Sequence, residues 1–144
     1  MHQLILVVED NPDHLELTVL TLEETGIAVQ IVVARDGAQA LDFLFGQGEY
    51  AGRDTDKQPS FVLLDMKLPK LSGLDVLRSI RANPLTMLVP VIMLTSSSEQ
   101  SDMLACYHSG ANSFVHKPVG FASFTKKLGC LQTYWLTVNE SVTV

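Results

Sequence analysis

The stretch Phe61-Val62-Leu63-Leu64-Asp65 decides the fold of this chain. Four consecutive apolar residues predict a strand buried on both faces, as in parallel sheets that helices cover on either side. The run ends in a carboxylate at Asp65. In open parallel sheets, ligands bind just beyond the carboxyl ends of the strands. Asp65 is therefore the first candidate for a functional residue, and its neighbours in the sheet decide its chemistry.

Length and composition indicate a globular protein. The chain has 144 residues, of which 47% are hydrophobic, so we expect one domain over residues 1–144, with a core at about 4–131, a tail at 132–144 and no output domain. The net charge of −6 argues against nucleic acid as the main partner, because phosphate binding needs a basic face. No apolar run approaches the ~18 residues that cross a membrane. Without a recognisable secretory signal, we expect a cytoplasmic protein whose Cys106 and Cys130 are reduced thiols in the core.

Strand-like and helix-like segments alternate along the chain. The predicted strands are residues 4–8, 29–34, 61–64, 91–94 and 112–115. The predicted helices are about 12–25, 37–44, 74–82, 99–109 and 121–131, and residues 46–59 form a long polar loop. This alternation predicts an α/β fold, a doubly wound five-stranded parallel sheet with helices on both faces. The strand order 2-1-3-4-5 is adopted from known doubly wound folds.

Polar residues follow four of the predicted strands at one edge of the sheet. Glu9 and Asp10 follow the first strand, Asp65 the third, Thr95 the fourth and Lys117 the fifth. With about 4.8 Å between neighbouring strands, the three carboxylates would share one cleft that the Lys117 side chain can reach. Carboxylates this close repel one another, and a hard cation with oxygen ligands relieves the repulsion. The cluster predicts a Mg²⁺ site with room for waters and a phosphate.

Such a site suits phosphoryl chemistry. With a metal neutralising it, one carboxylate can accept a phosphoryl group as an acyl phosphate. Lys117 would then supply a positive charge to the phosphoryl oxygens, and the Thr95 hydroxyl would supply a donor. Ser96 is small and leaves the acceptor accessible, while Lys67 and Ser97 flank the expected path of an attacking water.

Each of these residues also has an ordinary structural explanation. Taken alone, Asp65 is most simply a solvated charge or a helix cap, and Glu9 and Asp10 could cap the first helix. Thr95 could open a capping run of serines, and Lys117 could be a plain turn lysine. Their coincidence at one sheet edge favours the functional interpretation.

The chain resembles the receiver domain of two-component response regulators over residues 4 to about 131. The motifs that carry the resemblance are Val7-Val8-Glu9-Asp10-Asn11-Pro12, Asp65 followed by Leu68-Pro69 and Gly73, Leu94-Thr95-Ser96, and Gly110-Ala111-Asn112 leading to Lys117-Pro118. The resemblance implies a flavodoxin-like fold and a phosphoacceptor signalling protein rather than an enzyme with an external substrate. It also implies that a phosphohistidine on a sensor histidine kinase phosphorylates Asp65, followed by slow self-catalysed hydrolysis.

The resemblance further implies the ligands of the metal. Mg²⁺ would be held by Asp10, Asp65 and the backbone carbonyl of Lys67, with Glu9 contributing through water. Lys117 would pair with the phosphoryl group.

A conformational switch is also implied by the resemblance. Thr95 would bond the phosphoryl group and make room for the aromatic switch residue Phe114, which changes the face built from the fourth helix, fifth strand and fifth helix. Many members carry Tyr at this position, so Phe114 retains packing only. Ser96 and Ser97 control access to the phosphoryl site. The Lys117-Pro118 peptide bond is usually cis in this family, whereas from the sequence alone cis is the minority state of an X-Pro bond.

Three features resemble the stand-alone regulators that are paired with bacterial phytochrome kinases: Asp13-His14, the loop at 46–59, and an aromatic tail at Tyr134-Trp135. The apolar tail either packs onto its own domain or contributes to a symmetric homodimer that uses the fourth-helix to fifth-helix face.

Three rival functions share part of the pattern. A pseudo-receiver would keep the fold as a protein-binding module without phosphorylation, which the intact residue set argues against. A flavin or dinucleotide binder needs a phosphate loop after the first strand, where Glu9-Asp10-Asn11-Pro12-Asp13 would instead repel phosphate. A Mg²⁺-dependent phosphatase needs its nucleophile and a second acid in that same loop, and Asn11-Pro12 do not supply them.

Overall fold

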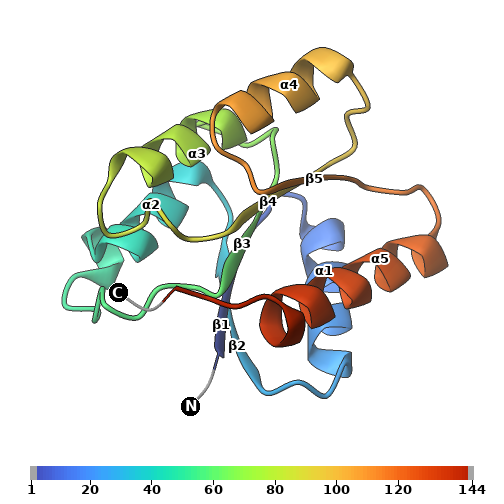
Figure 1. Ribbon diagram of the computed structural model, residues 1–144, viewed down its shortest axis with the longest axis horizontal. Coiled ribbons are helices and arrows are strands. Elements are labelled where there is room, and N and C mark those ends of the chain that lie inside the picture. Colours follow the sequence, from blue (N-terminus) through green and yellow to red (C-terminus); the bar gives the residue numbers. More distant parts are fainter. Residues whose placement is uncertain (1–2, 143–144) are drawn as a thin grey trace.

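The computed structural model describes residues 3–142, which form a parallel sheet between two layers of helices (Figure 1). The strands are β1 (Gln3–Val8), β2 (Val29–Ala34), β3 (Phe61–Leu64), β4 (Val91–Thr95) and β5 (Ser113–His116). The helices are α1 (Pro12–Glu24), α2 (Gly37–Phe45), η1 (Gly48–Tyr50), α3 (Gly73–Ala82), α4 (Gln100–His108), α5 (Phe121–Thr133) and η2 (Tyr134–Val138). The sheet has five strands in the order β2-β1-β3-β4-β5, all paired in parallel, which confirms the predicted doubly wound fold.

The two faces of the sheet are covered by different helices. Figure 1 shows α1 and α5 on one face and α2, α3 and α4 on the other. Along β3, Val62 and Leu64 pack into the core under α2 and α3, whereas Phe61 and Leu63 pack into the core under α1 and α5. Because both faces are covered, all four residues are at most 2% exposed. This double burial explains the uninterrupted apolar run that precedes Asp65.

Tight turns bring the helices close to the carboxyl ends of the strands. The Asn11 side chain caps α1 by accepting hydrogen bonds from the backbone N–H groups of Asp13 and His14, at 2.9 and 3.1 Å. At Gly73, an added Cβ would lie only 2.1 Å from the carbonyl oxygen of Asp65. Glycine is therefore required where α3 begins directly against the loop that carries Asp65.

The loop at residues 46–59 is bound to α2 by Arg53. Its guanidinium donates to the carbonyl of Phe43 at 2.6 Å and lies 4.0 Å from the centre of the Phe43 ring. Gln58 donates to the carbonyl of Leu44 at 3.0 Å. These bonds satisfy carbonyl groups at the C-terminal end of α2, where a helix has no partners of its own.

The sequence predicts that the apolar C-terminal tail either packs onto its own domain or contributes to a homodimer, and its residues fit both interpretations in part. Instead of ending near residue 131, α5 runs to Thr133 and continues as the π-helix η2. Leu136 is buried and Trp135 packs beside it in the core under α1 and α5. Tyr134 and Val138 are 48% and 62% exposed. Trp135 and Leu136 therefore pack onto their own domain, whereas Tyr134 and Val138 face outward.

One expectation from the sequence, a buried Cys130, and one from the family resemblance, a cis Lys117–Pro118 bond, are wrong. Cys106 is buried, but Cys130 is exposed rather than in the core, because it lines an open groove between α5 and β5. No peptide bond among residues 3–142 is cis, so the Lys117–Pro118 bond is trans, the isomer that X-Pro bonds favour by roughly 0.5–1 kcal/mol. Within the same residues, no helix has the length and apolar character needed to cross a membrane.

Candidate functional site

Three carboxylates meet at the carboxyl ends of β1 and β3. Val8 and Leu64 are paired in the sheet, so the residues that follow them emerge side by side. Glu9, Asp10 and Asp65 each offer a carboxylate oxygen within 4.8 Å of the others. Glu9 is buried, Asp65 is half-buried and Asp10 is exposed. The sheet register thus assembles the acidic cluster that the sequence predicted.

Lys117 lies among these carboxylates with its side chain only 8% exposed. Its Nζ donates to Glu9 Oε1 at 2.5 Å and to Asp65 Oδ2 at 3.1 Å. The residue is fixed beside β4 because its backbone N–H donates to the carbonyl of Thr95 at 2.7 Å. A charged amine can therefore reach the predicted phosphoryl site from β5, on the far side of β4.

The charges in the cleft do not balance. The pKa of Glu9 is raised to about 7, chiefly by burial and next by a hydrogen bond shared with Asp65, while Lys117 acts in the opposite direction. One ammonium faces three carboxyl groups, which leaves an excess of negative charge among oxygen ligands. A hard divalent cation that binds carboxylates and retains waters fits this donor set.

The residues predicted to flank the site occupy defined positions. The backbone N–H of Lys67 donates to Asp65 Oδ1 at 3.1 Å, so Lys67 lies beside the cluster, while its carbonyl as a metal ligand stays a prediction. Ser96 follows β4, and its carbonyl oxygen lies 3.1 Å from Nε2 of His116. Ser97 is not free at the cleft, because its hydroxyl donates to Asp102 of α4 at 2.5 Å.

Thr95 and Phe114 lie between the cleft and α4. Thr95 is buried, and its Oγ1 accepts a hydrogen bond from the backbone N–H of Ser97 at 3.2 Å, so the hydroxyl is engaged by the loop before α4. Phe114 is half-buried against the core under α2, α3 and α4. Its backbone N–H donates to the hydroxyl of Tyr107, on α4, at 3.2 Å.

The sequence interpretation missed His14 as part of the site. Its Nδ1 lies 3.2 Å from Lys117 Nζ and 3.7 Å from Glu9 Oε1. A signal was available, since His14 lies in the first turn of the helix that begins just after Glu9 and Asp10. The contact with Lys117 could not be predicted from the sequence, because it depends on the conformation of a side chain 103 residues away.

Replacing Lys117 by Met should destabilise the metal-free protein. The change leaves Glu9 and Asp65 without their shared cation, so the free energy of unfolding measured with urea should fall by about 3 kcal/mol. The matched control is Lys70→Met, because Lys70 pairs with Asp36 at 3.3 Å but is 69% exposed. That variant should change stability by less than about 1 kcal/mol. Equal losses in the two variants would contradict the buried ion pair described here.

Comparison with known proteins places this site in a family. The model of the response regulator receiver domain matches residues 5–129. The response regulator Rcp1 of Synechocystis sp. is 33% identical over 142 residues, which cover 99% of this chain and 92% of Rcp1. The chain therefore matches this relative over nearly the whole length of both proteins.

Solved structures agree with the sequence match. The Mn²⁺-bound form of Rcp1 has a TM-score of 0.89 at 31% identity and covers 97% of this chain and 99% of its own. The phosphorylated cyanobacterial phytochrome response regulator RcpA has a TM-score of 0.91 at 28% identity, with 98% and 99% covered. The bacteriophytochrome response regulator AtBRR is 46% identical with a TM-score of 0.76, with 97% and 99% covered. This chain belongs to the response regulator receiver domain family of signalling proteins and is a homologue of the phytochrome response regulators.

Proposed function

We propose that the chain accepts a phosphoryl group on Asp65 from a sensor histidine kinase and signals through the face formed by α4, β5 and α5. The observation that carries the proposal is the position of Lys117, whose ammonium lies 3.1 Å from Asp65 Oδ2 inside the acidic cleft. A lysine that only balanced buried charge could occupy this place, but in a receiver domain it also meets the incoming phosphoryl oxygens. Residues 4–131 would act as one receiver unit in the cytoplasm, where thiols such as Cys106 stay reduced.

In the proposed reaction, an oxygen of Asp65 forms a bond to phosphorus as the phosphorus–nitrogen bond of the kinase phosphohistidine breaks. The electron pair of that bond leaves with the imidazole. Asp10, Asp65 and the carbonyl of Lys67 would hold Mg²⁺, with Glu9 acting through water. When bound, the cation neutralises negative charge on the carboxylates and the transferring group. Hydrolysis later breaks the acyl phosphate by attack of water.

The remaining residues stabilise and report the phosphoryl group. Lys117 would exchange its bond with Asp65 for one with a phosphoryl oxygen while retaining Glu9. Thr95 would turn its hydroxyl from Ser97 toward the phosphoryl group, and Phe114 would occupy the space released. Since the Ser97 hydroxyl is bonded to Asp102, the same movement is transmitted to α4. Access to the acyl phosphate would depend on the small side chain of Ser96.

The partner kinase is proposed to be a phytochrome. This rests on RcpA, a cyanobacterial phytochrome response regulator, and AtBRR, a bacteriophytochrome response regulator, which resemble this chain over almost its full length. The aromatic tail and the loop at 46–59 add to that support, because they lie outside the residues that perform the chemistry.

Phosphoryl uptake tests the central proposal. Incubated with Mg²⁺ and acetyl phosphate, the wild type should gain one phosphoryl group that intact-mass spectrometry detects and mild base removes. Asp65→Asn should gain none, because the amide cannot form an acyl phosphate. Asp56→Asn is the control, since Asp56 lies in the exposed loop away from the cleft, and it should match the wild type. Absence of uptake by the wild type would favour a pseudo-receiver that only binds partner proteins.

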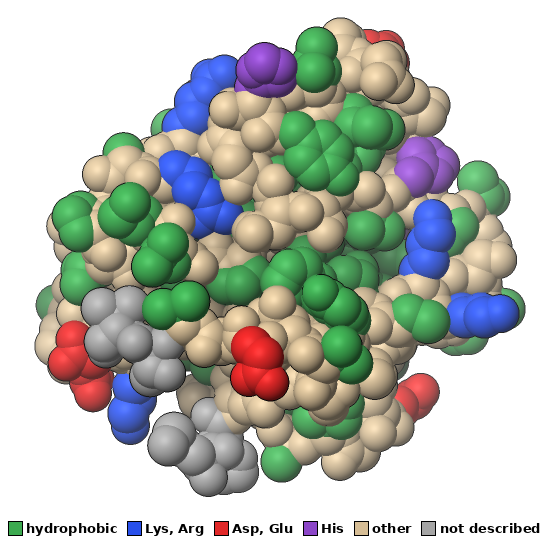
Figure 2. Space-filling view, in the orientation of Figure 1, with side chains coloured by type: hydrophobic (Ala, Val, Ile, Leu, Met, Phe, Trp, Pro, Cys, Tyr) green, Lys and Arg blue, Asp and Glu red, His purple; other side chains and the backbone are tan. Residues whose placement is uncertain are grey.

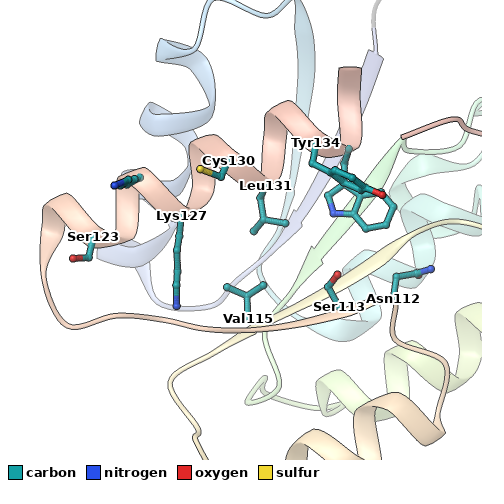
Figure 3. A pocket seen from close by; sticks show the side chains of 10 residues that line it. Asn112, Ser113, Val115, Ser123, Lys127, Cys130, Leu131 and Tyr134 are labelled. Atoms are coloured by element: carbon teal, nitrogen blue, oxygen red, sulfur yellow. The ribbon is translucent and has the colours of Figure 1, made fainter. Parts of the chain in front are cut away.

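A homodimer through α4, β5 and α5 is the second part of the proposal. A groove of about 770 Å³ lies between the free edge of β5 and α5. Figure 3 shows Val115 below and Leu131 above facing one another across it, with Tyr134 at one end. In Figure 2, apolar side chains gather in and around the hollow at the middle of this face. An edge strand beside an apolar groove suits a second copy of the chain.

Substitution of an exposed aromatic residue tests the dimer. Tyr134→Glu adds a charge to the rim of the groove, so sedimentation equilibrium should show a dimer for the wild type and a shift toward monomer for the variant. Leu20→Glu is the matched control, because Leu20 of α1 has nearly the same exposure, 49% against 48%, and lies outside the groove. A monomeric wild type under both free and acetyl-phosphate-treated conditions, or an equal effect of the two substitutions, would remove the proposed interface.

A further inference from the structure

His14 lies at the entrance of the cleft, and the phosphoryl transfer proposed above gives it no role. It lies in the first turn of α1, where its backbone N–H is held by the Asn11 cap at 3.1 Å. Its side chain is 48% exposed, and Nδ1 points to Lys117 Nζ at 3.2 Å. The helix cap therefore fixes the imidazole between solvent and the buried ammonium.

The ammonium of Lys117 has three N–H donors, and the structure supplies three acceptors for them. Two are carboxylate oxygens, Glu9 Oε1 at 2.5 Å and Asp65 Oδ2 at 3.1 Å, and the third is His14 Nδ1. Accepting this bond requires neutral imidazole, since imidazolium has a donor at both nitrogens and would face Lys117 as a like charge. With Nδ1 as the acceptor, His14 differs from the other two acceptors of Lys117, which are carboxylates.

The acceptors differ in what the reaction demands of them. Asp65 gives up its hydrogen bond with Lys117 when its oxygen bonds phosphorus, and that N–H of the ammonium then becomes available to a phosphoryl oxygen. Glu9 alone does not fix the position of the ammonium at that moment, because Nζ can still rotate about a single hydrogen bond. A second fixed acceptor on α1, outside the reacting carboxylate, restricts the ammonium to one place.

We propose that His14 is a positioning residue for Lys117: its neutral Nδ1 accepts a hydrogen bond that holds the ammonium at the entrance through which the phosphoryl donor arrives. This inference rests on the proposed phosphoryl transfer and adds a residue to it. An ammonium that is already in place need not be reoriented when the phosphoryl group is transferred. A residue that positions it therefore affects the rate of the transfer.

Two substitutions distinguish the effect of losing the hydrogen-bond acceptor from the effect of losing the ring. His14→Asn places an amide oxygen where Nδ1 lies and keeps the acceptor, whereas His14→Phe keeps a ring and removes the acceptor. With Mg²⁺ and acetyl phosphate, uptake by His14→Phe should be slower by about fivefold, as expected for loss of one bond to a charged group that water partly replaces. His14→Asn should stay within about twofold of the wild type. Leu20→Phe and Leu20→Asn, at a position on α1 with 49% exposure, should not change the rate.

A second readout follows Lys117 directly, without phosphoryl donor. In ¹⁵N spectra of the lysine ammonium groups, the Lys117 signal, assigned through Lys117→Arg, should persist in the wild type and in His14→Asn through slow exchange with water. It should broaden or vanish in His14→Phe. The Mg²⁺ dissociation constant should be unchanged in both His14 variants, because His14 is not among the predicted metal ligands.

Several results would overturn this role. They are equal uptake by His14→Phe and the wild type, equal loss in His14→Asn and His14→Phe, a weakened Mg²⁺ affinity, or an unaltered ammonium signal in His14→Phe. Failure of the wild type to take up a phosphoryl group would instead defeat the proposed function. The metal-free ammonium spectrum would still decide whether His14 holds Lys117.

Discussion

The buried ion pair of Lys117 with Glu9 and Asp65 is the interaction on which the rest of the structure depends. It joins the ends of β1 and β3 to the segment after β5, across the intervening strand β4. Isolated carboxylates are unfavourable in such a cleft by several kcal/mol, so a cation must accompany them. One ammonium is not enough for the set that includes Asp10, and the pKa of Glu9 is accordingly raised, first by burial and then by Asp65. The cleft is therefore receptive to a divalent cation and to the phosphoryl chemistry that such a cation supports.

The surrounding fold keeps this charged cluster rigid. β3 is packed on both faces, so the position of Asp65 is set by two cores rather than by its own loop. Gly73 brings the start of α3 into contact with that loop. On the other side, the hydroxyls of Thr95 and Ser97 connect the end of β4 to α4 through hydrogen bonds of 3.2 and 2.5 Å. The proposed phosphorylation switch needs a rigid acceptor beside a loop whose hydrogen bonds can be exchanged.

The sequence predicted the sheet and the acidic cluster because both follow from local patterns. Apolar runs identify strands, and parallel strands bring the residues after Val8 and Leu64 to one edge. Details that depend on side-chain paths were beyond such reasoning. The bond from Lys117 to His14 is one, and the attachment of Ser97 to Asp102 is another, because a serine run also fits a simple helix cap. The exposure of Cys130 depended on how α5 is rotated against α1, which periodicity in a short helix defines only weakly.

The most direct test of the account is Mg²⁺ binding measured by isothermal titration calorimetry in the wild type and in Asp10→Asn. Asp10 is the exposed member of the cluster, so its substitution removes a ligand charge without opening the core. The account predicts that the wild type binds one Mg²⁺ per chain and that Asp10→Asn binds it at least tenfold more weakly, a change of about 1.4 kcal/mol. A wild type that binds no Mg²⁺, or an Asp10→Asn variant that binds it equally well, would contradict the claim that the unbalanced charge around Lys117 forms a metal site.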